Sequence, residues 1–332
     1  MNTIPVFVGL DYHQSAVQVC MVDAMGKTLG NRRCINAVDE VVRYADGFGV
    51  VKGAAVEACA GAANFAEALI AQAGWRVEMA HPGYVSRMKL NPDKTDYSDA
   101  RMLAELIRAG LLPRVWLAPE EVRELRVLVR HRQQLANERR ATKLRVSALL
   151  REQRCLNAPA RSWTRPWLDW LDSEAALSPQ GRWMVRRHLN RLEGLKREIT
   201  EAEDRLAEAT KNDTLVKRLM EEPGIGPVTA WTMRAEIGRF DRFHNGKQLA
   251  RFCGLSPRNA SSGARQADAG LIRAANKELR TVLIEAGHRL ARIHPRWNAL
   301  ACQLRERGKP GSLVAAAVAN RWVRGLYHRL AV

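Results

Sequence analysis

The sequence predicts an α/β domain followed by a long helical region, so the fold class is α/β plus all-α. Three observations carry this prediction. Short apolar runs alternate with helical patterns over residues 1–115, which is typical of a partly parallel sheet. From Pro119 onward the pattern becomes one long helix rich in arginine. A glycine-containing turn between two helical patterns, Pro223 to Ala230, then opens a third part that is helical.

The length and charge of the chain limit what it can be. Its 332 residues are enough for two or three domains. Lys and Arg number 53 against 35 Asp and Glu, which gives a net charge of +18. Such an excess favours a polyanionic partner, most simply nucleic acid. No apolar run could span a bilayer, and the N-terminus has neither a basic segment nor a cleavage site. We therefore expect a cytoplasmic protein with no membrane partner.

The first part, residues 1–115, begins with a predicted buried strand at 4–11. Two hairpin-linked strands follow it, and this order suggests an RNase H-like sheet. The elements expected after the first strand are strands 15–22, 28–34, 52–58 and 76–80 and helices 37–46, 62–73 and 96–109.

Four acids occur where these elements begin or end. Asp11 and Glu57 each close an apolar run, and Asp96 and Asp99 lie three residues apart at a helix start, where both can face one spot. Either aspartate could instead be the N-cap of that helix. Converging carboxylates would form a site for one or two Mg²⁺ (or Mn²⁺) ions, since these cations prefer oxygen ligands. Two such ions can stabilise the attacking and the leaving oxygen in phosphoryl transfer.

The second part, residues 116–212, contains two predicted long helices, at about 119–155 and 181–211. The first could be a solvated coiled-coil arm or an arm that contacts phosphates. Few acids offset the charge of its later half, which favours phosphate contact. The second could pack back antiparallel or dimerise. The basic residues that we expect to contact nucleic acid here are Arg130, Arg139, Arg140 and Lys143.

The third part, residues 213–332, opens with a sequence that resembles a helix-hairpin-helix. Gly224 and Gly226 would allow a tight turn whose backbone N–H groups face a phosphate, with the dipole of the next helix adding to the attraction. The alternative is an ordinary glycine-rich turn between two helices. Further helices are expected from about 274, at 295–307 and at 313–330.

A loop near residues 254–263 carries two adjacent serines, Ser261 and Ser262. Arg258 and Arg265 flank them closely enough in sequence to bind a phosphate. From the residues alone Ser262 is a weak candidate for a nucleophile. A serine needs a base, metal or cation to activate it, and serines are common in turns.

Five motifs, in this order and spacing, resemble those of the DEDD transposases of insertion sequences, the family that includes the Piv-type DNA invertases. The resemblance covers nearly the whole chain. The motifs are Gly9-Leu-Asp11, Val56-Glu-Ala58, Lys94-Thr-Asp-Tyr-Ser-Asp-Ala-Arg-Met-Leu-Ala-Glu105, Pro223-Gly-Ile-Gly226, and Gly254-Leu-Ser-Pro257 followed by Ser262-Gly263. This chain departs from the family at Cys59, where the family more often has Glu-Ala-Thr-Gly after the strand; the departure affects the local turn and not the acid.

The resemblance implies a RuvC-like N-terminal domain, a coiled coil and a C-terminal domain with a nucleophilic serine. The catalytic and metal-binding acids would be the four named above, and Ser262 would be the nucleophile, with Ser261 as the fallback. The implied partners are donor and target DNA, a structured guide RNA encoded by the element, and further copies of the chain in a dimer or tetramer. The implied location is the bacterial cytoplasm, at the nucleoid.

Three other functions compete with this one. A metal-dependent junction resolvase would use the same acids with water as nucleophile and form no covalent intermediate. A non-catalytic nucleic-acid-binding protein would use the acids only as caps and strand ends. A sugar-kinase-like phosphotransferase also begins with an apolar strand ending in Asp, but no phosphate-binding glycine motif follows Asp11 and the net charge of +18 does not suit such an enzyme.

Overall fold

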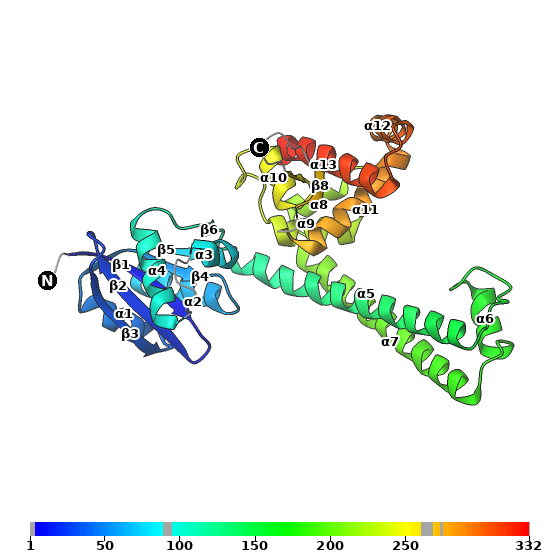
Figure 1. The fold of residues 1–332 in the computed structure, drawn as a ribbon, viewed down its shortest axis with the longest axis horizontal. Coiled ribbons are helices and arrows are strands. Elements are labelled where there is room, and N and C mark those ends of the chain that lie inside the picture. The colour runs from blue at the N-terminus through cyan, green and yellow to red at the C-terminus, as the bar shows by residue number, and fades with distance from the viewer. Residues whose placement is uncertain (1–3, 89–94, 260–267, 273–274, 332) are drawn as a thin grey trace. The chain divides into compact units, whose positions relative to one another are not determined.

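A six-stranded sheet forms the centre of the first of two units, Met1–Ala118, in the computed structural model (Figure 1). The structure describes residues 4–88, 95–259, 268–272 and 275–331. The strand order is β3-β2-β1-β4-β5-β6, with β1 antiparallel to β2 and parallel to β4. The strands are Pro5–Tyr12 (β1), Ala16–Asp23 (β2), Thr28–Ile35 (β3), Val50–Glu57 (β4), Val77–Ala80 (β5) and Arg114–Val115 (β6). This mixed sheet is consistent with the RNase H-like domain that the sequence suggests.

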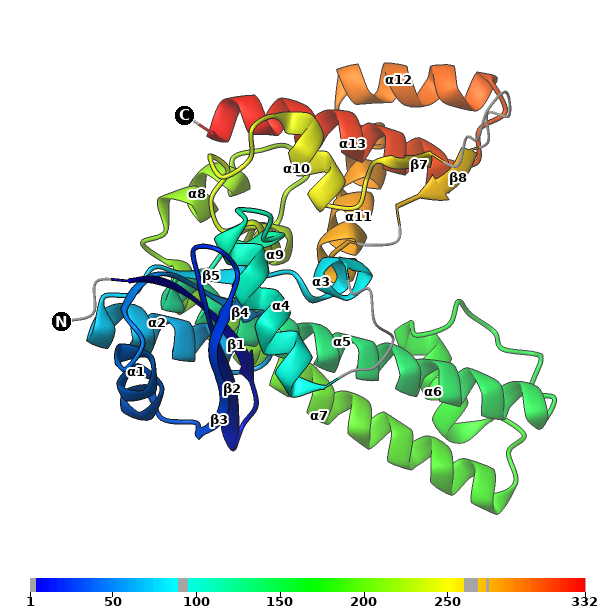
Figure 2. The ribbon, with the colours of Figure 1, turned by 60° about the vertical axis from the view of Figure 1, so that its left-hand side comes forward.

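Helices cover both faces of the sheet, because side chains along each strand alternate between the faces. On one face, Val8 and Leu10 of β1 share a core cluster with residues of α1 (Val38–Asp46) and α2 (Ala62–Ala73). On the other face, Cys20 and Val22 pack against the alanines of α4 (Asp96–Arg108). Figure 2 shows α1 and α2 on the side of the sheet opposite to α4.

Gly9 of β1 allows α4 to approach the sheet backbone closely. A Cβ atom at this position would lie 1.9 Å from the carbonyl oxygen of Ala100 and 2.4 Å from the amide nitrogen of Ala104. Both neighbours are backbone atoms of α4, so no side chain could rotate away to make room. The helix can therefore keep its position only if residue 9 is glycine.

The second unit, Pro119–Val332, begins with a pair of antiparallel helices. These are α5 (Glu120–Glu152) and α7 (Pro179–Thr210), and Leu135 of α5 packs with Leu195 and Ile199 of α7. Ion pairs flank this contact, between Arg132 and Glu203 at 2.7 Å and between Arg191 and Glu138 at 2.7 Å. The remaining elements are α6 (Arg165–Ser173), α8 (Thr214–Met220), α9 (Pro227–Ile237), α10 (Gly246–Phe252), β7 (Pro257–Asn259), β8 (Asp268–Leu271), α11 (Lys277–Ile293), α12 (Pro295–Glu306) and α13 (Gly311–Leu330).

A buried carboxylate ties α5 to the C-terminal helices. Glu236 of α9 is only 4% exposed, and Arg130 of α5 binds it through two hydrogen bonds of 3.0 and 3.1 Å. Asn276 donates a third hydrogen bond to the same carboxylate, and the Nε of Arg126 donates to the carbonyl of Ala235. The hydrogen bonds to Glu236 raise the pKa of Arg130. Arg130, expected from the sequence to contact nucleic acid, thus has a partner within the protein.

Several short elements were not among those expected from the sequence. They are α3 (Pro82–Met88), the two-residue strand β6, α6, α10 and the small β7–β8 hairpin. Among the described residues, no helix combines the length and the apolar character that a membrane span requires.

We predict that Gly9→Ala will lower the free energy of unfolding by about 3 kcal/mol, because the added methyl group forces α4 away from β1. Urea unfolding of the full chain, followed by circular dichroism, measures this change. Gly47→Ala is the matched control: its backbone is helical and the nearest atom to an added Cβ is 3.5 Å away. Equal stability of the two variants would contradict the close packing of α4.

A second prediction compares two arginines of α5: Arg130, which binds the buried Glu236, and Arg139, which has no ion pair among the described residues. Arg130→Ala should lower the free energy of unfolding by about 2 kcal/mol, because it leaves the buried Glu236 short of two hydrogen bonds. Arg139→Ala, on the same helix, should change it by less than about 0.5 kcal/mol. The same urea experiment tests both, and the prediction is wrong if Arg139→Ala destabilises the chain as much as Arg130→Ala does.

Candidate active site

The two aspartates at the start of α4 are not the N-cap of the helix. Thr95 is the N-cap, and its side-chain oxygen accepts a hydrogen bond from the backbone N–H of Ser98 at 3.1 Å. The Ser98 side chain reaches back to the N-cap in turn, which completes a capping box. Asp96 and Asp99 are therefore not needed as caps. They lie in the first turn, where the helix dipole favours negative charge.

Asp11 and Glu57 lie at the ends of neighbouring strands. β1 and β4 are parallel, and their last paired residues are Leu10 and Val56, each directly before one of the acids. Both carboxylates also act on one nearby thiol. Burial raises the pKa of Cys59, and the charges of Glu57 and Asp11 raise it further. Asp11 and Glu57 thus lie at the same end of two neighbouring strands, where the sequence predicts that they can converge.

His13 joins the strand acids to the helix acids. Its Nε2 lies 3.2 Å from Oδ2 of Asp11 and 3.4 Å from Oδ1 of Asp96. One ligand atom from each of these three residues lies within 4.8 Å of the other two. His13 is not among the residues that the sequence predicts for this site. The available signal was its spacing, because residues i and i+2 of an extended chain face the same side and His13 follows Asp11 by two.

The site concentrates negative charge in a half-buried place. Burial raises the pKa of the Asp11 carboxyl, and the charges of Asp96 and Asp99 raise it further, while His13 opposes this shift. Asp99 is itself buried, with 8% of its surface exposed. Carboxylates held this close repel one another unless a cation lies among them. Their hard oxygen atoms fit a divalent cation such as Mg²⁺ or Mn²⁺.

The serine part of the predicted site lies outside the described residues. Ser261, Ser262 and Arg265 fall in the range 260–267, for which the structure gives no placement. Arg258 is described, and it is exposed on β7.

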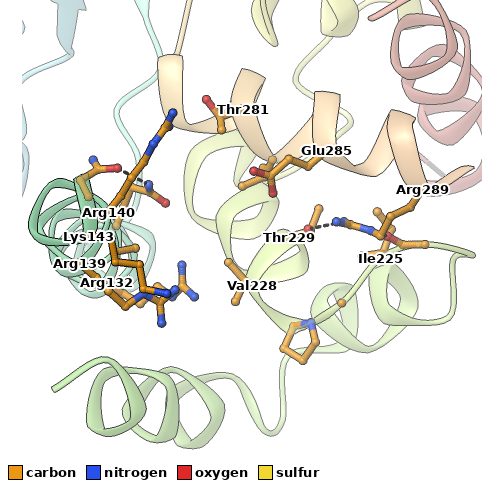
Figure 3. A pocket seen from close by; sticks show the side chains of 17 residues that line it. Arg132, Arg139, Arg140, Lys143, Ile225, Val228, Thr229, Thr281, Glu285 and Arg289 are labelled. Carbon is orange, nitrogen blue, oxygen red and sulfur yellow. Dashed lines mark hydrogen bonds between the residues drawn. The ribbon is translucent and has the colours of Figure 1, made fainter. Parts of the chain in front are cut away.

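Most of the predicted nucleic-acid residues come together elsewhere, in the second unit. A cavity of about 770 Å³ is lined by Arg139, Arg140 and Lys143 of α5 and by Gly224 and Gly226 of the turn before α9 (Figure 3). These five residues were chosen from two segments some 80 residues apart in sequence. The fold places both segments on one cavity, whereas Arg130 lies outside its lining.

Two family models match consecutive parts of the chain. Residues 8–154, which contain all four acids, match the DEDD transposase family of IS110 elements, described as "Transposase". Residues 216–302, which contain both serines and the glycine turn, match the family described as "Transposase IS116/IS110/IS902 family". The two matches follow one another along the chain and together cover more than half of it.

Curated relatives carry the same description. The transposase for insertion sequence element IS1111A of Coxiella burnetii is 29% identical over 293 residues, which cover 86% of this chain and 78% of that protein. A probable family 20 transposase of Pseudomonas aeruginosa is 28% identical, with 82% of each chain covered. The transposase for insertion sequence element IS1328 of Yersinia enterocolitica is 27% identical, covering 70% of this chain and 68% of that protein. The chain therefore belongs to the IS110/IS116 family of DEDD insertion-sequence transposases, and it is an enzyme that acts on DNA.

Proposed function

We propose that this transposase cuts and rejoins DNA with a divalent metal held by Asp11, Glu57, Asp96 and Asp99 and with Ser262 as the nucleophile. The observation that carries the metal site is the convergence of Asp11 and Asp96 on His13 at one edge of the sheet. Asp99 adds its charge from the same helix turn, and Glu57 ends the neighbouring strand. The parallel pairing of β1 with β4 supports the inclusion of Glu57, because it places Glu57 at the same end of the sheet as Asp11.

The acids and the serine would have different tasks in this proposal. A bound Mg²⁺ would offset the negative charge that builds up on a phosphate under attack. The four carboxylates would hold that ion, and none of them would serve as a helix cap. The Oγ of Ser262 would form a bond to phosphorus while a phosphorus–oxygen bond of the DNA strand breaks. The serine proton would pass to the departing oxygen, so that one strand end becomes a hydroxyl and the other a phosphoserine.

The proposed function also includes a guide RNA. It is supported by the family resemblance and by the net charge of +18, which suits a protein that binds several nucleic-acid strands. Base pairing between RNA and DNA would read the target sequence, so that the protein needs mainly backbone contacts.

A resolvase-like nuclease that uses water is the alternative function. The acidic site supports it equally well, because the same carboxylates and metal can activate water instead of a serine. The two functions differ in one product: only the serine mechanism leaves DNA covalently attached to the protein.

We predict a covalent adduct when the full chain is incubated with cognate DNA, Mg²⁺ and the transcribed non-coding flank of its gene. A denaturing gel with labelled DNA detects it. Ser262→Ala and Asp11→Asn should each abolish the adduct, the first by removing the nucleophile and the second by removing a metal ligand. Ser261→Ala, the matched control, should retain it. Cleavage without an adduct, unchanged in Ser262→Ala, would establish the water mechanism instead.

We also predict that His13 supports metal binding by positioning Asp11 and Asp96. His13→Ala should weaken Mn²⁺ binding about tenfold, since groups that orient metal-binding carboxylates contribute this much. Asp11→Asn should weaken it further, because it removes a charged ligand. Electron paramagnetic resonance of free Mn²⁺, titrated with the full chain, gives the affinities. His131→Ala, an exposed histidine of α5, is the control, and equal binding by all four proteins would place the metal elsewhere.

A further inference from the structure

The cavity in the second unit has two chemically different walls. Figure 3 shows Arg139, Arg140 and Lys143 projecting from α5 on one side, and Glu285 of α11 on the other, with Val228 and Thr229 of α9 between them. Its volume of about 770 Å³ suits a group the size of a nucleotide, whereas a double helix is too wide to enter.

Some cations around the cavity have partners within the protein, and others have no ion pair among the residues that the structure describes. Arg132 is paired with Glu203 at 2.7 Å, and Arg289 donates to the carbonyl of Gly224 at 2.9 Å and to the hydroxyl of Thr229 at 3.3 Å. Arg139 and Arg140, by contrast, have no carboxylate partner within the described part of the chain. Two arginines that line one cavity and have no ion pair among the described residues are suited to bind phosphate oxygens.

The floor of the cavity favours the same ligand. Gly226 is the N-cap of α9, and Pro227 is its first residue. Val228 and Thr229 therefore lie in the first turn, where N–H groups have no partner inside the helix. An added Cβ at Gly226 would meet nothing within 4 Å, so the backbone of the turn is open to a ligand. Arg289 fixes this turn from α11 through its two hydrogen bonds.

Glu285 shows that the ligand is more than a phosphate. It is exposed at the cavity wall, and within the described residues no cation pairs with it. A carboxylate repels phosphate, so the backbone of a bound strand must follow the α5 wall. The α11 wall then faces the sugar and the base, and a carboxylate there accepts hydrogen bonds from amino groups on the edge of a base.

We propose that this cavity binds one unpaired nucleotide of a nucleic-acid strand, with backbone phosphates on Arg139 and Arg140 and the base edge on Glu285. The inference deepens the proposed function and rests on it only for the presence of a nucleic-acid partner. A carboxylate only accepts hydrogen bonds, and the exocyclic amino group of cytosine donates them. Uracil has an acceptor, its O4 oxygen, at the same point of the base edge, so the site prefers cytosine over uracil. The base must be unpaired, since its hydrogen-bonding edge is otherwise occupied.

The test is binding of short fluorescent oligonucleotides to the full chain, followed by anisotropy in the presence of EDTA. Oligomers of about eight nucleotides are long enough to reach the site and its flanks. Oligo(C) is compared with oligo(U), and oligo(dC) with oligo(dU), so that each pair differs only in the base. Ribose strands that bind more tightly assign the cavity to an RNA strand, and deoxyribose strands that bind more tightly assign it to DNA.

We expect the wild-type chain to prefer cytosine over uracil about tenfold. Glu285→Gln should reduce this preference to within about twofold, because glutamine both donates and accepts hydrogen bonds. Arg139→Ala with Arg140→Ala should weaken binding of both strands about tenfold and lower the salt dependence by about 1.4 in log–log slope, as the loss of two phosphate contacts predicts.

The control removes the same charge from another place. Arg305→Ala with Arg307→Ala changes two exposed arginines that do not line the cavity, and it should leave binding within about twofold of wild type. Equal binding of the two bases by wild type would overturn the proposal. So would a preference that Glu285→Gln retains, or a loss in the control as large as in the Arg139 and Arg140 variant.

This experiment and the adduct experiment fail separately. Oligonucleotide binding in EDTA needs neither the metal nor Ser262. If the chain shows the base preference but forms no adduct, the cavity proposal stands and the serine mechanism is wrong. A chain that forms the adduct but shows no base preference keeps the mechanism and loses the cavity.

Discussion

The close contact between α4 and β1 is the constraint on which the candidate active site depends. Asp11 lies next to the last residue of β1, and Asp96 and Asp99 lie in the first turn of α4. The distance between these acids is therefore set by how near the helix lies to the sheet. Gly9 and Ala100 make that approach possible by leaving the two backbones almost nothing between them. A larger residue at either position would move the whole first turn of α4, and both of its aspartates, away from Asp11.

The arginines of α5 show how one basic helix can serve two purposes. Arg130 satisfies the buried Glu236, and Arg126 reaches the backbone of the same helix, so these two hold α5 against the C-terminal helices. Two to three turns further on, Arg139 and Arg140 line the cavity and have no carboxylate partner in the part of the chain that the structure describes. The first pair fixes the position of the second, because the helix is rigid over this length. The contacts of Arg126 and Arg130 thus determine where Arg139 and Arg140 lie along the cavity.

The sequence predicts the long strands, the long helices and the strand-end acids well, because periodicity and strand ends are local signals. It could not decide whether Asp96 is a cap, since Thr95 is an equally good cap one residue earlier. The sequence also predicts that Arg130 contacts nucleic acid. Its partner within the protein, Glu236, is 106 residues away in the chain, so no local pattern indicates the pairing. Short elements such as α3 and α10 carry too few residues for a pattern, and contacts with the rest of the fold stabilise them. Glu285 escaped notice because an acid on a helix is usually only a solvated surface residue.

The two sites impose different requirements on a nucleic acid, and this division bears on where specificity arises. The acids at the ends of the strands would act on a phosphate through a bound metal ion. Every nucleotide carries a phosphate, so this site cannot distinguish one sequence from another. The cavity in the second unit is lined by guanidinium groups on one wall and by a carboxylate on another, and we propose that this combination binds an unpaired base. A strand whose bases are all paired would still offer its phosphates to the acidic site, but it would leave Glu285 without a hydrogen-bond donor. Under the proposed function, the protein's own choice of substrate would then depend on the second unit, and base pairing with a guide would supply the longer sequence.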